Sequence, residues 1–139
     1  MKYLFLLISV HSSFADNFNK LIKSIRSNDH QTFFAVLKED VDVNKKKWGV
    51  TPLYIAVHFD RDTMIEPLLK KGAQVNSLNG SKKRTAIHKA VSKGSEVIVK
   101  CLLDAGADIF QANKKGEIPL DEAKKINHEG LILLLSSSK

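Results

Sequence analysis

TPLYIAV at residues 51–57 is the first of three related segments in this chain. It recurs as TAIHKAV at 85–91 and as IPLDEAK at 118–124, at intervals of 34 and 33 residues. A second pair of segments, LLKKGA at 68–73 and LLDAGA at 102–107, places a glycine 21 residues after the threonine of each of the first two copies. Landmarks that keep one spacing indicate a structural repeat.

Each copy has the apolar spacing of two short helices. Ile87, Ala90 and Val91 stand at positions i, i+3 and i+4, which places them on one face of a helix. A second apolar stripe is expected from Val97, Ile98, Cys101, Leu102 and Ala105. Because one helix pair cannot bury its own apolar stripe, the copies are expected to stack on one another.

Helix start and stop signals flank these segments. Thr51 and Thr85 can cap the first helix of their copies, and Pro52 occupies a first turn, where its missing N–H costs no hydrogen bond. Gly72 and Gly106 follow the second helix, where a left-handed residue closes it without strain.

These segments resemble the ankyrin repeat, a unit of about 33 residues that begins T-P-L-H-x-A. The resemblance implies an all-α solenoid of about four stacked helix-turn-helix repeats. Its repeats would be 45–76 and 77–110, between an N-terminal cap at about 17–44 and a C-terminal cap at 111–139. The matching positions are Thr51, Pro52, Leu53, Ala56, Gly72, Thr85, His88, Ala90, Gly94, Gly106, Pro119, Leu120 and Ala123. In this family the motif histidine, here His88, ties neighbouring turns together by hydrogen bonds.

Two residues depart from the family pattern. Asp60 stands where the family places a glycine between its two helices, so we expect a strained positive φ there. Pro67 falls inside the second helix of the same repeat, where a proline removes one backbone hydrogen bond and costs up to about 3 kcal/mol.

The first residues have the pattern of an export signal. Lys2 is followed by an apolar run at 3–10, and Ser13 and Ala15 are small residues at the −3 and −1 positions of a signal-peptidase site. We therefore predict a signal peptide at 1–15, cleaved after Ala15, and a periplasmic or secreted domain at 16–139. The alternative is a short apolar helix packed on the domain. The run is shorter than the roughly 20 residues that span a bilayer.

Composition and motifs favour a protein that is not an enzyme. The chain has 139 residues, of which 43% are hydrophobic and 27% charged, as in an ordinary single domain. Cys101 is the single cysteine, so no intramolecular disulfide can form, and we interpret it as a small buried apolar residue. The histidines have no metal-ligand spacing, and no phosphate-binding loop or serine elbow occurs. Asp121 and Glu122 stand in a first helical turn, where acids stabilise the helix. We expect no catalytic residue, metal or cofactor.

The distribution of positive charge suggests a partner. The net charge is +7, and it becomes +6 once Lys2 is removed with the signal peptide. Basic runs at 45–47, 82–84 and 114–115 precede the three related segments, so stacking would align them on equivalent loops as one basic strip. Such a strip favours an acidic partner, although solvated lysines are also common in loops of this kind.

Aromatic residues beside the basic runs could anchor that partner, because aromatic side chains are enriched at protein interfaces. Trp48 follows the first run, and Phe110 is a further candidate. The candidate partner-binding residues are Lys45, Lys46, Lys47, Trp48, Tyr54, Phe59, Lys82, Lys83, Arg84, Lys114 and Lys115.

The resemblance implies a monomeric, non-catalytic protein–protein interaction module that works outside the cytoplasm through its finger-like loops and concave face. An alternative is an accessory or stabilising factor for a periplasmic enzyme. Binding to nucleic acid or to an anionic surface is a further alternative, which the fold and the predicted export do not favour.

Overall fold

The structure is a computed structural model that describes the backbone of residues 2–138 and the side chains of residues 14–138. Within these residues the chain forms eight helices and no strand. The helices are α1 (Lys2–Ser27), α2 (His30–Leu37), α3 (Pro52–His58), α4 (Asp62–Lys70), α5 (Ala86–Ser92), α6 (Glu96–Asp104), α7 (Pro119–Lys125) and α8 (Glu129–Ser137).

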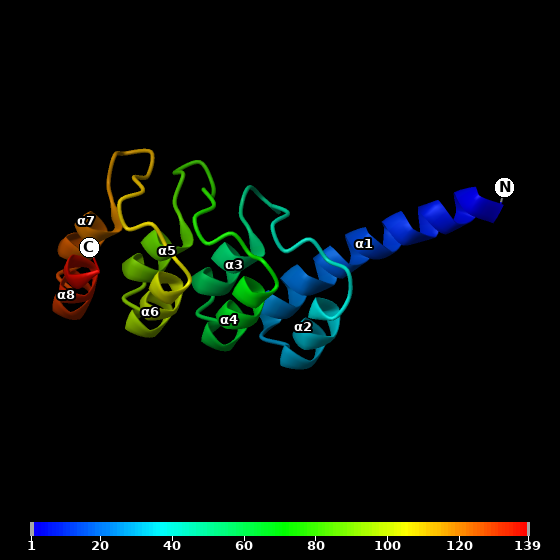
Figure 1. The fold of residues 1–139 in the computed structure, drawn as a ribbon, viewed down its shortest axis with the longest axis horizontal. Helices are drawn as coiled ribbons and strands as arrows, with labels where there is room; N and C mark the ends of the chain where they lie inside the picture. The colour runs from blue at the N-terminus through cyan, green and yellow to red at the C-terminus, as the bar shows by residue number, and fades with distance from the viewer. Residues whose placement is uncertain (1, 139) are drawn as a thin grey trace.

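The helices pair as antiparallel hairpins that stand side by side in one row (Figure 1). Helices α1, α3, α5 and α7 contact one another in sequence, and α4 also contacts α6. Each hairpin contributes to one continuous cluster of buried apolar side chains. The all-α solenoid of stacked helix pairs that the sequence predicts is therefore confirmed.

Thr51 caps its helix as the sequence predicts, whereas the hydroxyl of Thr85 at the start of α5 contacts the ring of His88 at 2.8 Å. The hydroxyl of Thr51 accepts a hydrogen bond from the backbone N–H of Tyr54 at 3.3 Å, and Pro52 occupies the first turn of α3. At the start of α7, the carboxylate of Asp121 accepts a hydrogen bond from the N–H of Ile118 at 2.9 Å. The contacts of Thr51 and Asp121 each pair a backbone N–H at a helix start that no helical carbonyl can reach.

The turn inside each hairpin contains one left-handed residue. These residues are Asn28 (φ 59°), Asp60 (φ 54°), Gly94 (φ 72°) and Asn127 (φ 53°). The prediction for Asp60 is therefore confirmed, at a conformational cost of about 1 kcal/mol for a residue with a Cβ atom. Asn and Asp tolerate this region better than other non-glycine residues, which explains their use in the remaining turns.

Pro67 lies inside α4, as its position in the sequence predicts. Helix α4 nevertheless continues to Lys70, and the residues that it buries are Met64, Ile65 and Leu68. Packing of this apolar face against the core therefore holds the helix together across the missing hydrogen bond.

The predicted apolar stripe of α6 is wrong in part. Ile98, Val99 and Leu102 are its buried residues, whereas Val97 is 68% exposed. Ala105 is exposed as well, after the end of the helix. Helix α6 packs mainly on α5 and α4, and Val97 lies on the edge that these two helices leave exposed.

Cys101 is only partly buried, against the prediction of a buried residue. Its side chain packs on the edge of the core, and this burial raises the pKa of the thiol. A raised pKa keeps the sulfur protonated and unreactive, in agreement with a packing role.

Helix α1 continues without a break past Ala15, and its N-terminal half extends away from the row of hairpins (Figure 1). Its C-terminal half buries Phe18, Leu21 and Ile25 against the core. The side chains of residues 2–13 lie outside the described set, and cleavage after Ala15 stays a prediction. Among the helices described, none combines the length and the apolar character needed to cross a bilayer.

Candidate partner-binding site

Three loops project from the same side of the row (Figure 1). We name them the first finger (residues 44–51), the second finger (77–85) and the third finger (111–118). Backbone hydrogen bonds join neighbouring fingers: the N–H of Gly80 donates to the carbonyl of Gly49 at 3.0 Å, and that of Lys114 donates to the carbonyl of Lys82 at 2.9 Å. The three basic runs therefore lie in one row on a connected edge.

A buried asparagine fixes the second finger against the start of α3. Asn79 is 2% exposed, and its side-chain oxygen accepts a hydrogen bond from the backbone N–H of Thr51 at 2.8 Å. Its amide nitrogen donates to the carbonyls of Ser77 and Arg84. The sequence does not predict this role of Asn79, because its only local signal is an Asn-Gly pair in a long loop.

His88 fixes the third finger in a different way. Its Nε2 lies 3.0 Å from the carbonyl of Glu117, and its Nδ1 lies 3.3 Å from the backbone N of Thr85 and 2.8 Å from the Thr85 hydroxyl. Because the Thr85 N–H donates to Nδ1, the ring proton resides on Nε2 and is donated to Glu117. Burial lowers the pKa of His88, which keeps the ring neutral. These are the hydrogen bonds between turns that the family resemblance implies for this histidine.

Arg84 is largely buried between the second finger and α7. Its guanidinium lies 2.9 Å from the carboxylate of Glu122 on α7, and the two side chains are only 15% and 19% exposed. It also donates to the carbonyl of His88 at 3.0 Å. Arg84 therefore connects the second finger to the next helix pair and presents little surface to a partner.

The side chain of Lys47 points toward α1 instead of outward from the first finger. Its ammonium contacts the side-chain oxygen of Asn19 on α1 and lies 5.1 Å from the centre of the Trp48 ring. The remaining lysines of the fingers are exposed. We name these six the lysine strip: Lys45, Lys46, Lys82, Lys83, Lys114 and Lys115.

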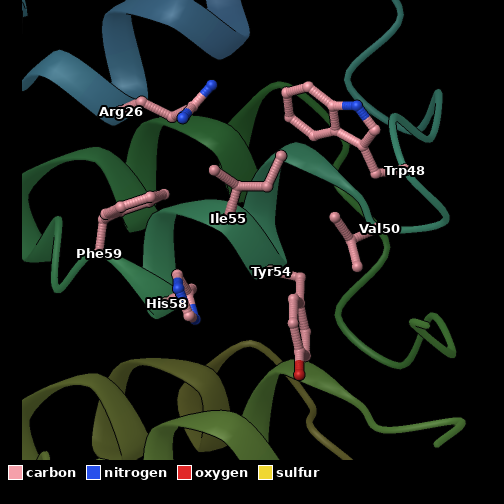
Figure 2. Close-up of a pocket in the computed structure, with 7 residues that line it drawn as sticks. All are labelled: Arg26, Trp48, Val50, Tyr54, Ile55, His58 and Phe59. Carbon is pink, nitrogen blue, oxygen red and sulfur yellow. The ribbon is translucent and has the colours of Figure 1, made fainter. Parts of the chain in front are cut away.

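A groove opens between α1, the first finger and α3, with a volume of about 510 Å³. We name it the aromatic groove. Figure 2 shows its seven lining residues, which are Arg26, Trp48, Val50, Tyr54, Ile55, His58 and Phe59. Three of the four aromatic residues proposed from the sequence thus meet in one place, whereas Phe110 is exposed elsewhere.

Trp48 is the most exposed aromatic residue of this groove, at 66%. It occupies the tight turn between Lys47 and Val50 with a φ of 55°, a region that usually takes Gly, Asn or Asp. A bulky residue held in this conformation is strained, and strain of this kind concentrates at functional sites.

Positive charge surrounds the aromatic rings. The guanidinium of Arg26 lies 5.5 Å from the centre of the Trp48 ring, and that of Arg61 lies 5.7 Å from the Phe59 ring. Burial, followed by the charges of Lys89 and Lys93, lowers the pKa of His58. No carboxylate occurs among the residues that line the groove in the described part of the chain. The groove thus combines apolar surface with a positive potential.

A separate hollow of about 460 Å³, away from the aromatic groove, lies between the second and third fingers and α7. It contains several lysines, but its two carboxylates are paired, Glu117 with Lys125 and Glu122 with Arg84. Over the side chains that the structure describes, no group of three His, Cys, Asp or Glu residues could hold a metal ion.

Comparison with known proteins agrees with this architecture. The profile of the family described as Ankyrin repeat matches residues 48–80 and 82–114. The chain is 35% identical over 104 residues to BRCA1-associated RING domain protein 1 of Caenorhabditis elegans, covering 75% of this chain and 15% of that protein. It is 34% identical over 91 residues to a putative ankyrin repeat protein of fowlpox virus, covering 63% of this chain and 27% of that protein. Inversin of Gallus gallus is 34% identical over 96 residues, with coverage of 68% and 9%.

The chain is an ankyrin-repeat protein. It spans well under a third of the length of each of these relatives. Ankyrin repeats are generally non-enzymatic modules for protein–protein interaction, and they indicate that this chain has a protein partner.

Proposed function

We propose that this protein is a non-catalytic interaction module that acts outside the cytoplasm and binds an acidic protein through its fingers and concave face. The observation that carries the proposal is the lysine strip, in which six exposed lysines stand on three fingers in one row. Aligned like charges on a rigid edge raise the local potential and steer an oppositely charged partner.

The fingers are rigid enough to present this charge without rearrangement. Backbone hydrogen bonds connect all three, and the ammonium of Lys46 donates to the carbonyl of Leu78 on the second finger at 2.6 Å. A surface that is already ordered loses little conformational entropy when its partner binds.

The test is affinity capture with the mature chain, followed by a measurement of affinity for the captured protein at several salt concentrations. Replacing the six lysines of the lysine strip by serine should weaken binding at least about tenfold and flatten the salt dependence, because steering charge is lost. Circular dichroism should show an unchanged fold, since these side chains are exposed and the backbone hydrogen bonds between the fingers remain when the Lys46 contact is lost.

A matched control replaces six exposed lysines that lie outside the fingers. They are Lys20, Lys38, Lys70, Lys71, Lys100 and Lys124. This control changes the net charge by the same amount. Because the replaced lysines lie outside the fingers, the control should retain most of the affinity. Equal loss in both variants would mean that total charge, rather than the lysine strip, determines binding.

The proposed location has its own test. Sequencing of the N-terminus of protein recovered outside the cytoplasm should give a chain that begins at Asp16. A chain that retains residues 1–15 and is found only in the cytoplasm would contradict the export proposal without affecting the lysine strip.

A further inference from the structure

We propose that the aromatic groove selects the partner by binding an extended acidic segment that carries one bulky apolar side chain. This inference rests on the proposed function and assigns a recognition site to it. The lysine strip attracts an acidic surface, whereas the groove would distinguish one acidic sequence from another.

The aromatic groove continues into a second hollow of about 440 Å³ on the α1 side of Trp48. The two share Arg26, Trp48 and Phe59. The second hollow is completed by Asn19, Ile22, Lys23, Ser27 and Lys47. Together they form a binding surface with two lobes, one on each side of the Trp48 ring.

The lobe on the α3 side is apolar. Val50, Tyr54 and Ile55 line it, and Figure 2 shows Ile55 between the rings of Trp48 and Phe59. An aliphatic or aromatic side chain placed there would remove both its own surface and the exposed Trp48 ring from water. The strained turn would then serve to hold the Trp48 ring where a ligand side chain can cover it.

The lobe on the α1 side is positively charged. Lys23, Arg26 and Lys47 contribute three cations, and its lining contains no carboxylate among the described side chains. The nearby carboxylate of Asp60 is paired with Lys93 at 2.7 Å. Aspartate or glutamate residues next to the apolar anchor would therefore meet unopposed positive charge.

A protein segment fits this surface better than a nucleic acid. Binding of single strands depends on open aromatic faces on which bases stack. Here Trp48 is exposed, whereas the Phe59 ring is half-buried and packs edge-on against His58 at 4.9 Å, so the described residues of the groove lack a row of open rings for successive bases. The apolar lobe in addition presents Val50 and Ile55, which suit an aliphatic side chain.

Trp48 is the only tryptophan of the chain, so its fluorescence reports on the groove directly. The probe is a library of short peptides displayed on phage and selected on the full chain. We expect selected peptides to be rich in Asp and Glu around one Leu, Ile, Met or Phe. A tryptophan-free synthetic copy should change Trp48 fluorescence to saturation. Changing its apolar anchor to Ser, or its acids to amides, should weaken it at least about tenfold.

Arg26→Glu places a carboxylate between the two lobes and should weaken the same peptide at least about tenfold. Lys100→Glu makes the same change of charge on α6, outside the groove, and should reduce affinity less than about threefold. Both positions are exposed, so both variants should fold, which circular dichroism checks.

The outcomes separate this inference from the proposed function. Acidic peptides that need the lysine strip but ignore Arg26→Glu and leave Trp48 fluorescence unchanged would overturn the groove and keep the proposed function. Selection without acidic residues would overturn the acidic segment assigned to the groove and leave the proposed function to the test on the lysine strip. Tighter binding of an oligothymidylate of equal charge, with the same change in fluorescence, would assign the groove to nucleic acid and overturn the inference.

Discussion

Two neighbouring junctions of the array are held by different residues. In the first junction, between the α3/α4 and α5/α6 hairpins, the buried side chain of Asn79 accepts the N–H of Thr51. In the second junction, between the α5/α6 and α7/α8 hairpins, His88 links Thr85 to the carbonyl of Glu117. Each junction thus has one buried polar side chain that crosses from one hairpin to the next finger or helix.

The difference follows from the residue at the motif histidine position. His88 fills that position in α5, but its equivalent in α3 is Tyr54. Asn79, on the second finger, supplies the buried hydrogen bond across the first junction. The ring of Tyr54 lines the aromatic groove instead. A departure from the family pattern therefore coincides with the candidate binding surface.

The largest expected effect is the loss of the second junction. His88→Ala should lower the free energy of unfolding by about 3 kcal/mol, because it leaves a cavity and removes the partner of the Glu117 carbonyl. Chemical denaturation measures this value. His58→Ala is the control, since this exposed ring crosses no junction and its loss should cost less than about 0.5 kcal/mol. Similar values for both variants would contradict the role assigned to His88.

The first junction should be weakened less. Asn79→Ala should lower the free energy of unfolding by about 2 kcal/mol, because it leaves the buried N–H of Thr51 without a partner. Asn76→Ala removes a comparable pair of hydrogen bonds, to Gly106 and Asp108, from an exposed site and should cost less than about 1 kcal/mol. An equal loss in the two variants would show that burial of Asn79 adds nothing.

Acid should affect the two junctions unequally. Burial holds the pKa of His88 below its ordinary value, so the unfolded chain binds a proton more readily than the folded one. The contribution of His88 is therefore complete above about pH 6.5, the ordinary histidine pKa, and is lost progressively as the pH falls below it. His58 shifts the same way.

Hydrogen exchange can locate this effect. Between about pH 7.5 and about pH 5.5, after correction for the intrinsic rate, protection should fall more around the third finger than around Thr51, since Asn79 does not titrate. His88→Gln should flatten the dependence of the melting temperature on pH. An unchanged slope in that variant would assign the acid sensitivity to other groups.

The smallest effect is expected at the turn of α3/α4. Asp60→Gly relieves the left-handed backbone but removes the ion pair with Lys93 across the first junction. These contributions oppose each other at about 1 kcal/mol or less each, so the net change should be under about 0.5 kcal/mol. A loss above about 1 kcal/mol in thermal denaturation would mean that the ion pair matters more than the backbone.

The sequence predicts the features that depend on spacing within one repeat. The fold, the cap at Thr51 and the left-handed residues at Asp60, Gly72 and Gly106 follow from local pattern alone. The prediction for Val97 is wrong because periodicity indicates the apolar face of a helix but not how much of that face a neighbouring helix covers.

Contacts between repeats could not be predicted from the sequence. Asn79, the pairing of Arg84 with Glu122 and the entry of Arg26 into the groove each join residues that are distant along the chain. Their positions depend on the angle at which hairpins stack, which no motif encodes. The role of the three basic runs as a binding strip stays a prediction.

The unbroken course of α1 sets an order of events for a chain that is exported. The peptide bond after Ala15 lies within this helix, where backbone N–H and C=O groups are engaged with one another. A peptidase binds its substrate as extended backbone, so cleavage must precede the formation of this helix. On the proposed export route, the α1/α2 hairpin would therefore assemble only after transport across the membrane and cleavage after Ala15.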